Sequence, residues 1–281
     1  MSARSGPAAS GEAPGASRAA AWRHRTPRAR LALWAFWLAL VALSVWCWQL
    51  MTADTIWAFV ADAPRQAADL GARMVPPSWS YIERLWMPLW DTLAIATLGT
   101  LAGVIMAVPV AFLAARNTTP SRWLVRPVAL FVIVASRSIN SLIWALLLVS
   151  IIGPGILAGI VAIALRSIGF VAKLLYEAIE ETDVGQIEAI TATGASGAQV
   201  LDYGIVPQVL PAFAGISVFR WDINIRESTI LGLVGAGGIG VQLQASLNTL
   251  AWPQVTLIFI VILATVVFSE WVSAKVRHAI I

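Results

Sequence analysis

Six long apolar runs constrain this chain more than any other feature of its sequence. The first occupies residues 31–51 and reads LALWAFWLALVALSVWCWQLM, and about 20 such residues cross a bilayer as a helix. The other five runs occupy residues 89–115, 127–152, 154–175, 209–233 and 253–273. Only 12% of the residues are charged, whereas soluble domains carry about 25%. The sequence therefore predicts an all-α polytopic membrane protein with six transmembrane helices.

The segments outside these runs indicate how the chain is divided. Residues 1–30 are rich in Ala, Gly, Ser, Pro and Arg and cannot bury enough apolar surface to fold alone, so we expect a disordered, basic, cytoplasmic tail. Residues 31–87 hold the first span and an extracytoplasmic segment, in which we expect an amphipathic interfacial helix before a Pro-Pro pair. Residues 88–281 are expected to form the membrane-embedded core, with a cytoplasmic loop at 177–207.

A secretory signal peptide is the alternative interpretation of residues 31–51, because arginines precede them. Signal peptides have apolar segments of about 7–15 residues that end at a cleavage site of small residues. This run is longer and ends in Trp46, Trp48 and Gln49, so we expect a retained span. Basic residues beside a span orient it in the membrane, and we favour that role for the arginines of the tail over nucleic-acid binding.

Counts of Lys and Arg predict the orientation of the spans. With six spans and an inner N-terminus, the inner segments hold eleven Lys and Arg residues and the outer segments hold three. Cytoplasmic segments carry the excess of basic residues, so both termini and the segment 177–207 are expected in the cytoplasm. That segment has six acids and no Lys or Arg, and it is either an idle loop or a docking surface. Its acidic start, Glu177–Asp183, touches either a partner or only water.

A glycine-rich stretch in the second half bears on nucleotide binding. Gly235, Gly237 and Gly240 match the pattern G-x-G-x-x-G, but the next acid is Glu270, whereas the dinucleotide motif requires an acid about 20 residues further on. We therefore expect Gly235, Gly237, Gly238 and Gly240 to form either a tight outer turn or a re-entrant bend. Both lysines of the chain follow an alanine, so there is no G-K-[ST] phosphate loop. One cysteine and two histidines make no metal-ligand cluster, and we expect this chain to bind no cofactor.

The fifth run contains the polar residues Arg220, Asp222, Asn224, Arg226 and Glu227. Charges inside a membrane are costly, and they usually face a bundle interior or a water-filled path. Helical spacing puts Arg220, Asn224 and Glu227 on one face and lets Asp222 pair with Arg226. Either the charges neutralise one another and hold helices together, or they line a path for an anionic solute, to which arginine offers bidentate contacts.

Arg137 and Asn140 in the third run are further candidates for such a path. Arg137 lies near the membrane midplane if its helix starts at the surface, and near the cytoplasmic mouth if the helix first follows the interface. Alternatively, Arg137 and Arg166 pair with acids of the fifth run or extend to the inner surface. Gly99 and Gly103 in the second run make a G-x-x-x-G pattern, which serves either close packing or a dimer contact.

The cytoplasmic segment contains Glu188-Ala189-Ile190, followed by Gly194 and then Pro207. This pattern resembles the E-A-A…G…P loop of ABC-importer membrane subunits, in which Gly and Pro stand 6 and 19 residues after Glu, as they do here. Ile190 replaces the second Ala of the family pattern. The resemblance implies that these five residues belong to a loop that couples the membrane subunit to an ATPase.

The run WDINIRESTILGLVGAGGIG at 221–240, together with ATGAS at 192–196 and PQVLP at 207–211, is similar to permease subunits of phosphonate ABC importers. The similarity covers residues 88–281. It implies a type I ABC importer permease fold and import of phosphonate or a related phosphorus oxyanion, namely phosphite, hypophosphite or phosphate. The residues assigned to the path are Arg137, Asn140, Arg220, Asp222, Asn224, Arg226 and Glu227.

The resemblance also implies the partners and the location. These are a second copy of the chain, two cytoplasmic ABC ATPase subunits that hold ATP and Mg, and an extracytoplasmic phosphonate-binding protein, all at the plasma (inner) membrane. A membrane-anchored scaffold without a solute path is the alternative from another class. A polytopic enzyme is disfavoured, because the sequence offers no candidate nucleophile or metal site.

Overall fold

Helices form all of the regular secondary structure in residues 27–280, which are the residues that the computed structural model describes. The predicted all-α fold is confirmed for this part of the chain. Most of the tail predicted at 1–30 lies outside it, since residues 1–26 are not described. The remaining tail residues belong to the first helix, which begins at Pro27 rather than at residue 31.

The described chain consists of α-helices, two short 3-10 helices (η1 and η3) and a π-helical turn (η2). In chain order they are α1 (Pro27–Thr52), α2 (Trp57–Met74), η1 (Trp79–Tyr81), α3 (Ile82–Ala114), α4 (Val125–Ser138), α5 (Ser141–Ile152), α6 (Ile156–Glu180), α7 (Val184–Ala192), α8 (Gly197–Gln199), η2 (Val200–Ile205), α9 (Val206–Leu231), η3 (Gly232–Val234), α10 (Ile239–Asn248) and α11 (Trp252–Ile280).

The chain divides into two compact units, 1–64 and 65–281. In the first unit, α1 is 26 residues long, has no buried residue and has the length and hydropathy of a membrane span. The amphipathic helix predicted for the outer segment is α2, whose polar residues recur every three or four positions, as in Asp62, Gln66, Asp69 and Arg73. This spacing gives α2 one polar and one apolar side, and its place at a membrane interface stays a prediction.

The third predicted span, 127–152, is not one continuous helix. It is broken into α4 and α5, whose axes differ by 87°. Ile139 has an extended backbone, and the Asn140 side chain accepts a hydrogen bond from the Leu142 N–H (3.1 Å). Asn at this position caps the start of a new helix, which explains why the apolar run breaks here. Five other helical segments have the length and hydropathy of single spans, so the described chain has six spans if the bent pair counts as one.

Close packing of α3 on α6 accounts for the G-x-x-x-G pattern in the second apolar run. A Cβ atom at Gly103 would lie 2.6 Å from Cβ of Ser167, and one at Gly99 would lie 2.7 Å from Cγ2 of Ile163. Real Cβ contacts are not this short, so only glycine fits at either position. Both glycines therefore bring two helices of the same chain together, and the pattern requires no dimer contact.

Replacing Gly103 with Val should destabilise the α3–α6 contact by about 1–3 kcal/mol, because added atoms in a close-packed interface displace backbone. The expected result is a lower melting temperature of the purified protein in detergent. Gly71→Ala is the matched control, since no heavy atom lies within 4 Å of a Cβ at Gly71. Equal melting temperatures for the two variants would show that the contact is not tight.

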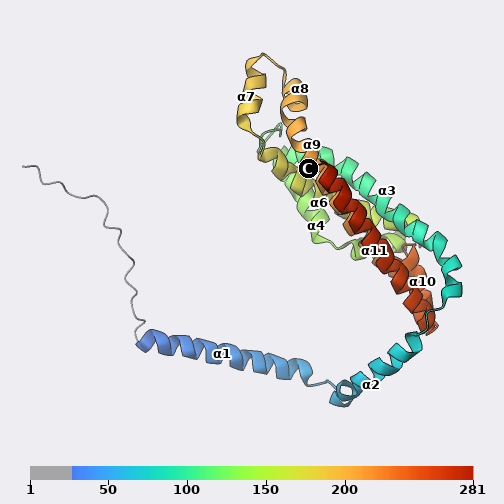
Figure 1. Ribbon diagram of the computed structural model, residues 1–281. Coiled ribbons are helices and arrows are strands. Elements are labelled where there is room, and N and C mark those ends of the chain that lie inside the picture. Colours follow the sequence, from blue (N-terminus) through green and yellow to red (C-terminus); the bar gives the residue numbers. More distant parts are fainter. Residues whose placement is uncertain (1–26, 281) are drawn as a thin grey trace, which may run out of the picture. The chain divides into compact units, whose positions relative to one another are not determined.

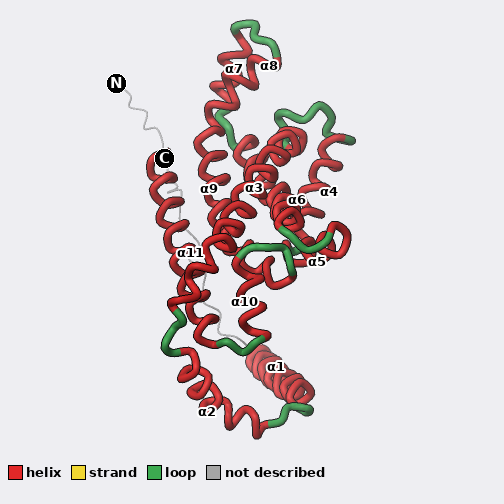
Figure 2. Tube along the Cα trace, turned by 90° about the vertical axis from the view of Figure 1, so that its right-hand side faces the viewer, coloured by secondary structure: helices red, strands yellow, loops and turns green. Residues whose placement is uncertain are grey.

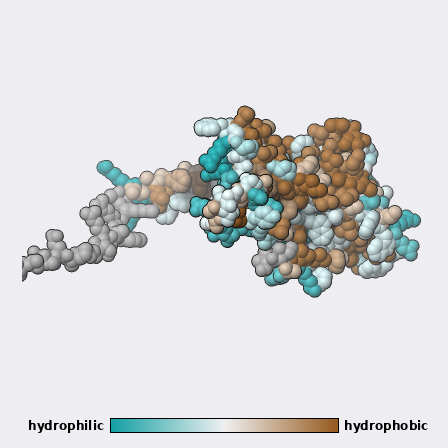
Figure 3. Space-filling model, turned by 90° about the horizontal axis from the view of Figure 1, so that it is seen from above, coloured by the Kyte–Doolittle hydropathy of each residue, from teal (hydrophilic) through white to brown (hydrophobic). Residues whose placement is uncertain are grey.

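The second unit has two distinct ends. In Figures 1 and 2, α7 and α8 project from one end, and α10 lies at the other. The last residues of α11 lie at the end that carries α7 and α8. Brown, apolar side chains cover much of the visible surface of the helical body in Figure 3, and teal polar side chains gather in separate patches. Many large apolar side chains are exposed on the helices, and such side chains suit contact with lipid.

Candidate functional site

The first candidate site is a projecting hairpin, residues 184–205, formed by α7, α8 and η2. Asp183 caps α7 by accepting a hydrogen bond from the Gly185 N–H (2.9 Å). Ile187 and Ile190 are half-buried and face the second arm, where a Cβ at Gly204 would lie 3.4 Å from Cδ1 of Ile190. The apolar side of α7 therefore closes the hairpin itself, and Glu188 and Ala189 are exposed on its outer face.

The tip of the hairpin depends on Gly194. Its φ is +84°, and no heavy atom lies within 4 Å of a Cβ built there. This left-handed conformation is open to glycine and strained for most other residues. The chain then enters α8 through a capping box, in which Gln199 accepts a hydrogen bond from the Ser196 N–H (2.8 Å). Pro207, the last residue of the family pattern, is exposed in the first turn of α9.

The acidic start of the segment, Glu177–Asp183, is largely engaged within the chain. Glu177 pairs with Lys173 one turn earlier in α6. Glu180 accepts a hydrogen bond from the Arg116 N–H (2.9 Å) and pairs with Arg126 (3.4 Å). These contacts attach the base of the hairpin to the α3–α4 connection and to the start of α4. The outer face of α7 stays exposed.

The second candidate site is a polar cluster of Thr100, Arg166, Ser167, Arg220, Asn224 and Glu227, on α3, α6 and α9. Arg220 is only 1% exposed, and its guanidinium donates to Ser167 Oγ (3.0 Å) and to Glu227 Oε2 (3.4 Å). The Asn224 amide donates to Thr100 Oγ1 (2.7 Å) and to Ser167 Oγ (3.0 Å). Arg220, Asn224 and Glu227 thus lie on one face of α9, as their spacing predicts.

Arg166 contacts this cluster from α6. Its Nε lies 3.5 Å from Glu227 Oε1, so the one carboxylate faces both Arg166 and Arg220. Pairing of Arg166 with an acid of α9 was one of the two interpretations of its sequence position. The side chains of Arg166 and Glu227 are 28% and 18% exposed, whereas that of Arg220 is 1% exposed. Arg166 is therefore the more accessible of the two arginines.

Asp222 and Arg226 form a separate pair on another side of α9. Arg226 Nη2 lies 2.9 Å from Asp222 Oδ2, and Ser269 of α11 donates to Asp222 Oδ1 (2.8 Å). The Asp222 side chain is 7% exposed and that of Arg226 is 45% exposed. This pair joins α9 to α11 and leaves its arginine accessible.

Arg137 and Asn140 lie at the bend between α4 and α5, and both are exposed. The side chain of Arg137 packs against α6 at Gly169. A Cβ built at Gly169 would lie 2.8 Å from Cγ of Arg137. Ser136 also joins α4 to α6, because the Gly169 N–H donates to its Oγ (2.9 Å). The stem of Arg137 therefore lies beside α6, and neither Arg137 nor Asn140 takes part in the hydrogen bonds of the polar cluster.

Several members of these sites carry no charge and were missed in the sequence. They are Thr100, Ser167 and Ser269. Each is a small hydroxyl residue in an apolar run, and such residues are frequent in membrane helices because they pack well and bond their own helix. Only the packing of α3, α6 and α11 against α9 distinguishes these three residues from the other Ser and Thr residues of the chain.

The glycines after α9 form a compact turn at the end opposite the hairpin. Gly235, Gly237 and Gly238 all have positive φ values, of 86°, 86° and 78°. The Gly155 N–H donates to the Gly235 carbonyl (3.0 Å), and the Ile239 N–H donates to Thr92 Oγ1 (2.8 Å). A Cβ at Gly240 would lie 2.8 Å from Cα of Gly232. The glycines thus let the segment that follows α9 pack closely against the start of α6 and against α3.

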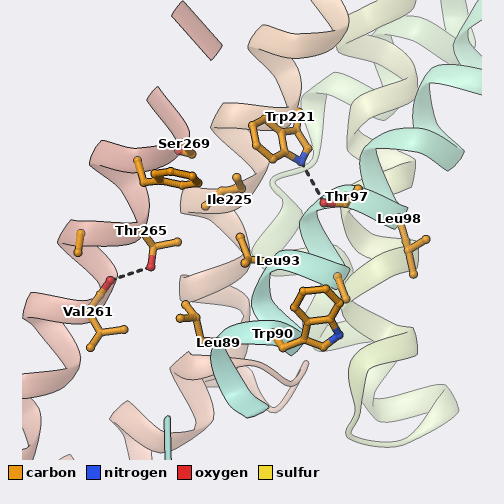
Figure 4. Close-up of a pocket in the computed structure, with 13 residues that line it drawn as sticks. Leu89, Trp90, Leu93, Thr97, Leu98, Trp221, Ile225, Val261, Thr265 and Ser269 are labelled. Carbon is orange, nitrogen blue, oxygen red and sulfur yellow. Dashed lines mark hydrogen bonds between the residues drawn. The ribbon is translucent and has the colours of Figure 1, made fainter. Parts of the chain in front are cut away.

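An apolar groove of about 800 Å³ lies between α3, α9 and α11. Trp90 and Trp221 line it, and Trp221 Nε1 donates to Thr97 Oγ1 (3.0 Å) (Figure 4). Its lining is almost entirely apolar. Because an anion loses its hydration in such surroundings, this groove suits hydrocarbon chains rather than a charged solute.

Comparison with known proteins shows similarity to membrane subunits of transport systems. A family described as binding-protein-dependent transport system inner membrane component matches residues 99–274. The phosphite transport system permease protein PtxC of Stutzerimonas stutzeri is 40% identical over 238 residues, which cover 85% of each chain. The phosphate-import permease protein PhnE of Mycolicibacterium smegmatis is 43% identical over 209 residues, covering 74% of this chain and 39% of that protein.

The fold has counterparts among solved structures. A chain of the MetNI methionine ABC transporter in inward-facing conformations superposes with a TM-score of 0.63 at 21% identity, covering 73% of this chain and 99% of that chain. At this identity the likeness concerns the fold. It confirms the fold expected from the sequence for the part of the chain that is covered.

Proposed function

Because the chain belongs to the family of binding-protein-dependent transport system inner membrane components, we propose that it is the permease subunit of an ABC importer that carries phosphonate or a related phosphorus oxyanion into the cell. The observation that carries this proposal is the projecting hairpin. The hairpin projects from one end of the helical body, and ion pairs and hydrogen bonds attach its base to that body. A partner outside the bilayer could therefore bind the hairpin and move the helices to which it is attached. Glu188, Ala189 and Ile190 lie on its first arm, and Gly194 forms its tip.

The partner at the hairpin is an ATPase subunit, which holds ATP and Mg because this chain has no phosphate loop of its own. Two such subunits act on two copies of the permease. The second copy supplies helices for the side of the solute path that one copy leaves open. The hairpin continues through η2 and Pro207 directly into α9. Movement of the hairpin would therefore pass along α9 to Arg220, Asn224 and Glu227.

The hairpin end faces the cytoplasm in this proposal, together with both termini, as the excess of Lys and Arg in the inner segments suggests. The opposite end, with α10 and the outer turn, then faces an extracytoplasmic binding protein that delivers phosphonate. The phosphorus oxyanion is suggested by two relatives, whose names describe phosphite transport and phosphate import. The path residues remain those on α9, with Arg137 and Asn140 at the bend of α4 and α5.

The proposal is tested by uptake into proteoliposomes that contain the permease, its ATPase subunits and its binding protein. Methylphosphonate, phosphite and phosphate are offered separately, with ATP inside or outside the vesicles. At least one of the three should accumulate only when ATP reaches the hairpin side. Failure of the permease to co-purify with any ATPase subunit in gentle detergent would instead support a scaffold without a solute path.

A further inference from the structure

We propose that Arg166 is the anion-binding group of a transit site near the middle of the membrane, and that Glu227 permanently neutralises Arg220 behind it. The ligand class is a small tetrahedral oxyanion. This inference rests on the proposed function and adds the site within the permease itself. It revises the path assignment for one residue: Arg220, which was predicted to line the path, becomes structural, and Arg166 becomes the ligand-binding arginine of the polar cluster.

The first argument is the charge of the cluster. Among the described residues, Arg166 and Arg220 face a single carboxylate, that of Glu227. One positive charge is therefore left without a counter-ion in a segment that crosses the membrane. Such a charge is costly at the bilayer centre, and a passing anion would compensate it.

The second argument is depth. Thr100, Arg166 and Arg220 each lie 14 residues from the hairpin-side end of their helix, on α3, α6 and α9 respectively. At 1.5 Å per residue this is about 21 Å along each helix, whereas the hydrocarbon core is about 30 Å thick. If these helix ends lie at the membrane surface, Thr100, Arg166 and Arg220 lie at one level well inside the membrane.

The third argument is access. Arg220 is enclosed: Ser167 and Glu227 accept from its guanidinium, and the ring of Phe170 lies 5.1 Å from Cζ. Arg166 Nε lies 3.5 Å from Glu227 Oε1, and the side chain of Arg166 is 28% exposed. A guanidinium whose terminal nitrogens remain available offers the fork of donors that binds an oxyanion through two oxygens.

The stem of another arginine packs against α6 about one turn from Arg166. Arg137 packs its stem against Gly169, which is three residues, or about one helical turn, beyond Arg166. The buried Oδ1 of Asn224 also lacks a hydrogen-bond partner among the described residues. An incompletely satisfied polar network fits a site that changes state better than a purely structural contact.

The test compares Arg166→Gln and Arg166→Lys in the complete importer, with Arg73→Gln as the matched control. Arg73 forms an exposed ion pair with Asp69 on α2, and such pairs contribute little to stability. We expect Arg166→Gln to reduce phosphite uptake at least about tenfold, as loss of a desolvated charge contact does. Arg166→Lys should be intermediate, and Arg73→Gln should transport as the wild type does.

Two further readouts separate binding from folding and assembly. Stimulation of ATP hydrolysis by the binding protein should persist in Arg166→Gln, because Arg166 lies far from the hairpin. Sodium phosphite should raise the melting temperature of the wild-type permease relative to sodium chloride of equal ionic strength, and it should not raise that of Arg166→Gln. Equal protection of both proteins, or normal uptake by Arg166→Gln, would overturn the inference. If the wild type itself imports no phosphorus oxyanion, the proposed function fails instead.

Discussion

Gly194→Val should uncouple the importer, reducing both ATP-dependent uptake and the stimulation of ATP hydrolysis by the binding protein about tenfold. Gly194 has a φ of +84°, where a residue with a Cβ is strained by about 1–2 kcal/mol and a β-branched residue is a genuine outlier. The strain would redirect the chain at the tip of the hairpin. The outer face of α7 would then no longer meet the ATPase in the same orientation.

Gly194→Asn is the control for this variant, because Asn adopts the left-handed conformation far more readily than other residues with a side chain. No heavy atom lies within 4 Å of a Cβ at this position, so a difference between Val and Asn reports backbone conformation rather than a clash. Asn should keep most of the uptake. Normal uptake and stimulation in the Val variant would exclude the tip of the hairpin from coupling.

The apolar runs were enough to predict most of the architecture, because the length of a membrane helix follows directly from the thickness of the bilayer. They could not reveal the break between α4 and α5. Residues 127–135 and 142–149 are apolar, so the average hydropathy of the whole run stays high although polar residues lie between them. The break depends on the extended backbone of Ile139 and on the capping hydrogen bond of Asn140, which are local features that an average over 20 residues hides.

The sequence likewise predicted only part of the arrangement of the charged residues of α9. Their spacing was enough to divide them into two faces, because a helix has a fixed period. It could not decide which arginine is enclosed, since Arg220 and Arg226 both lie among other polar residues of the same helix. The difference arises from α6 and α3, which supply Ser167 and Thr100 to one face, while α11 supplies only Ser269 to the other.

The carboxylate of Glu227 should contribute more to the stability of the permease than that of Asp222. Glu227→Gln would leave Arg220, which is 1% exposed, without a carboxylate. Removing one partner from a buried ion pair costs about 3–5 kcal/mol, so we expect a large fall in the melting temperature of the permease and little protein in the membrane. Arg220→Met combined with Glu227→Gln should recover much of the loss, because it removes the stranded charge.

Asp222→Asn is the matched control, since it removes the carboxylate from the other pair of the same helix. Its partner Arg226 is 45% exposed, so the freed guanidinium can reach polar surroundings and the cost should be smaller. The Asn side chain also keeps an oxygen that can accept the hydrogen bond from Ser269. The measurement is the melting temperature of each variant in one detergent. Glu227→Gln should melt at a lower temperature than both Asp222→Asn and the double variant. If Glu227→Gln were as stable as Asp222→Asn, Glu227 would not be the permanent counter-ion of Arg220, and the division of roles between Arg166 and Arg220 would lose its basis.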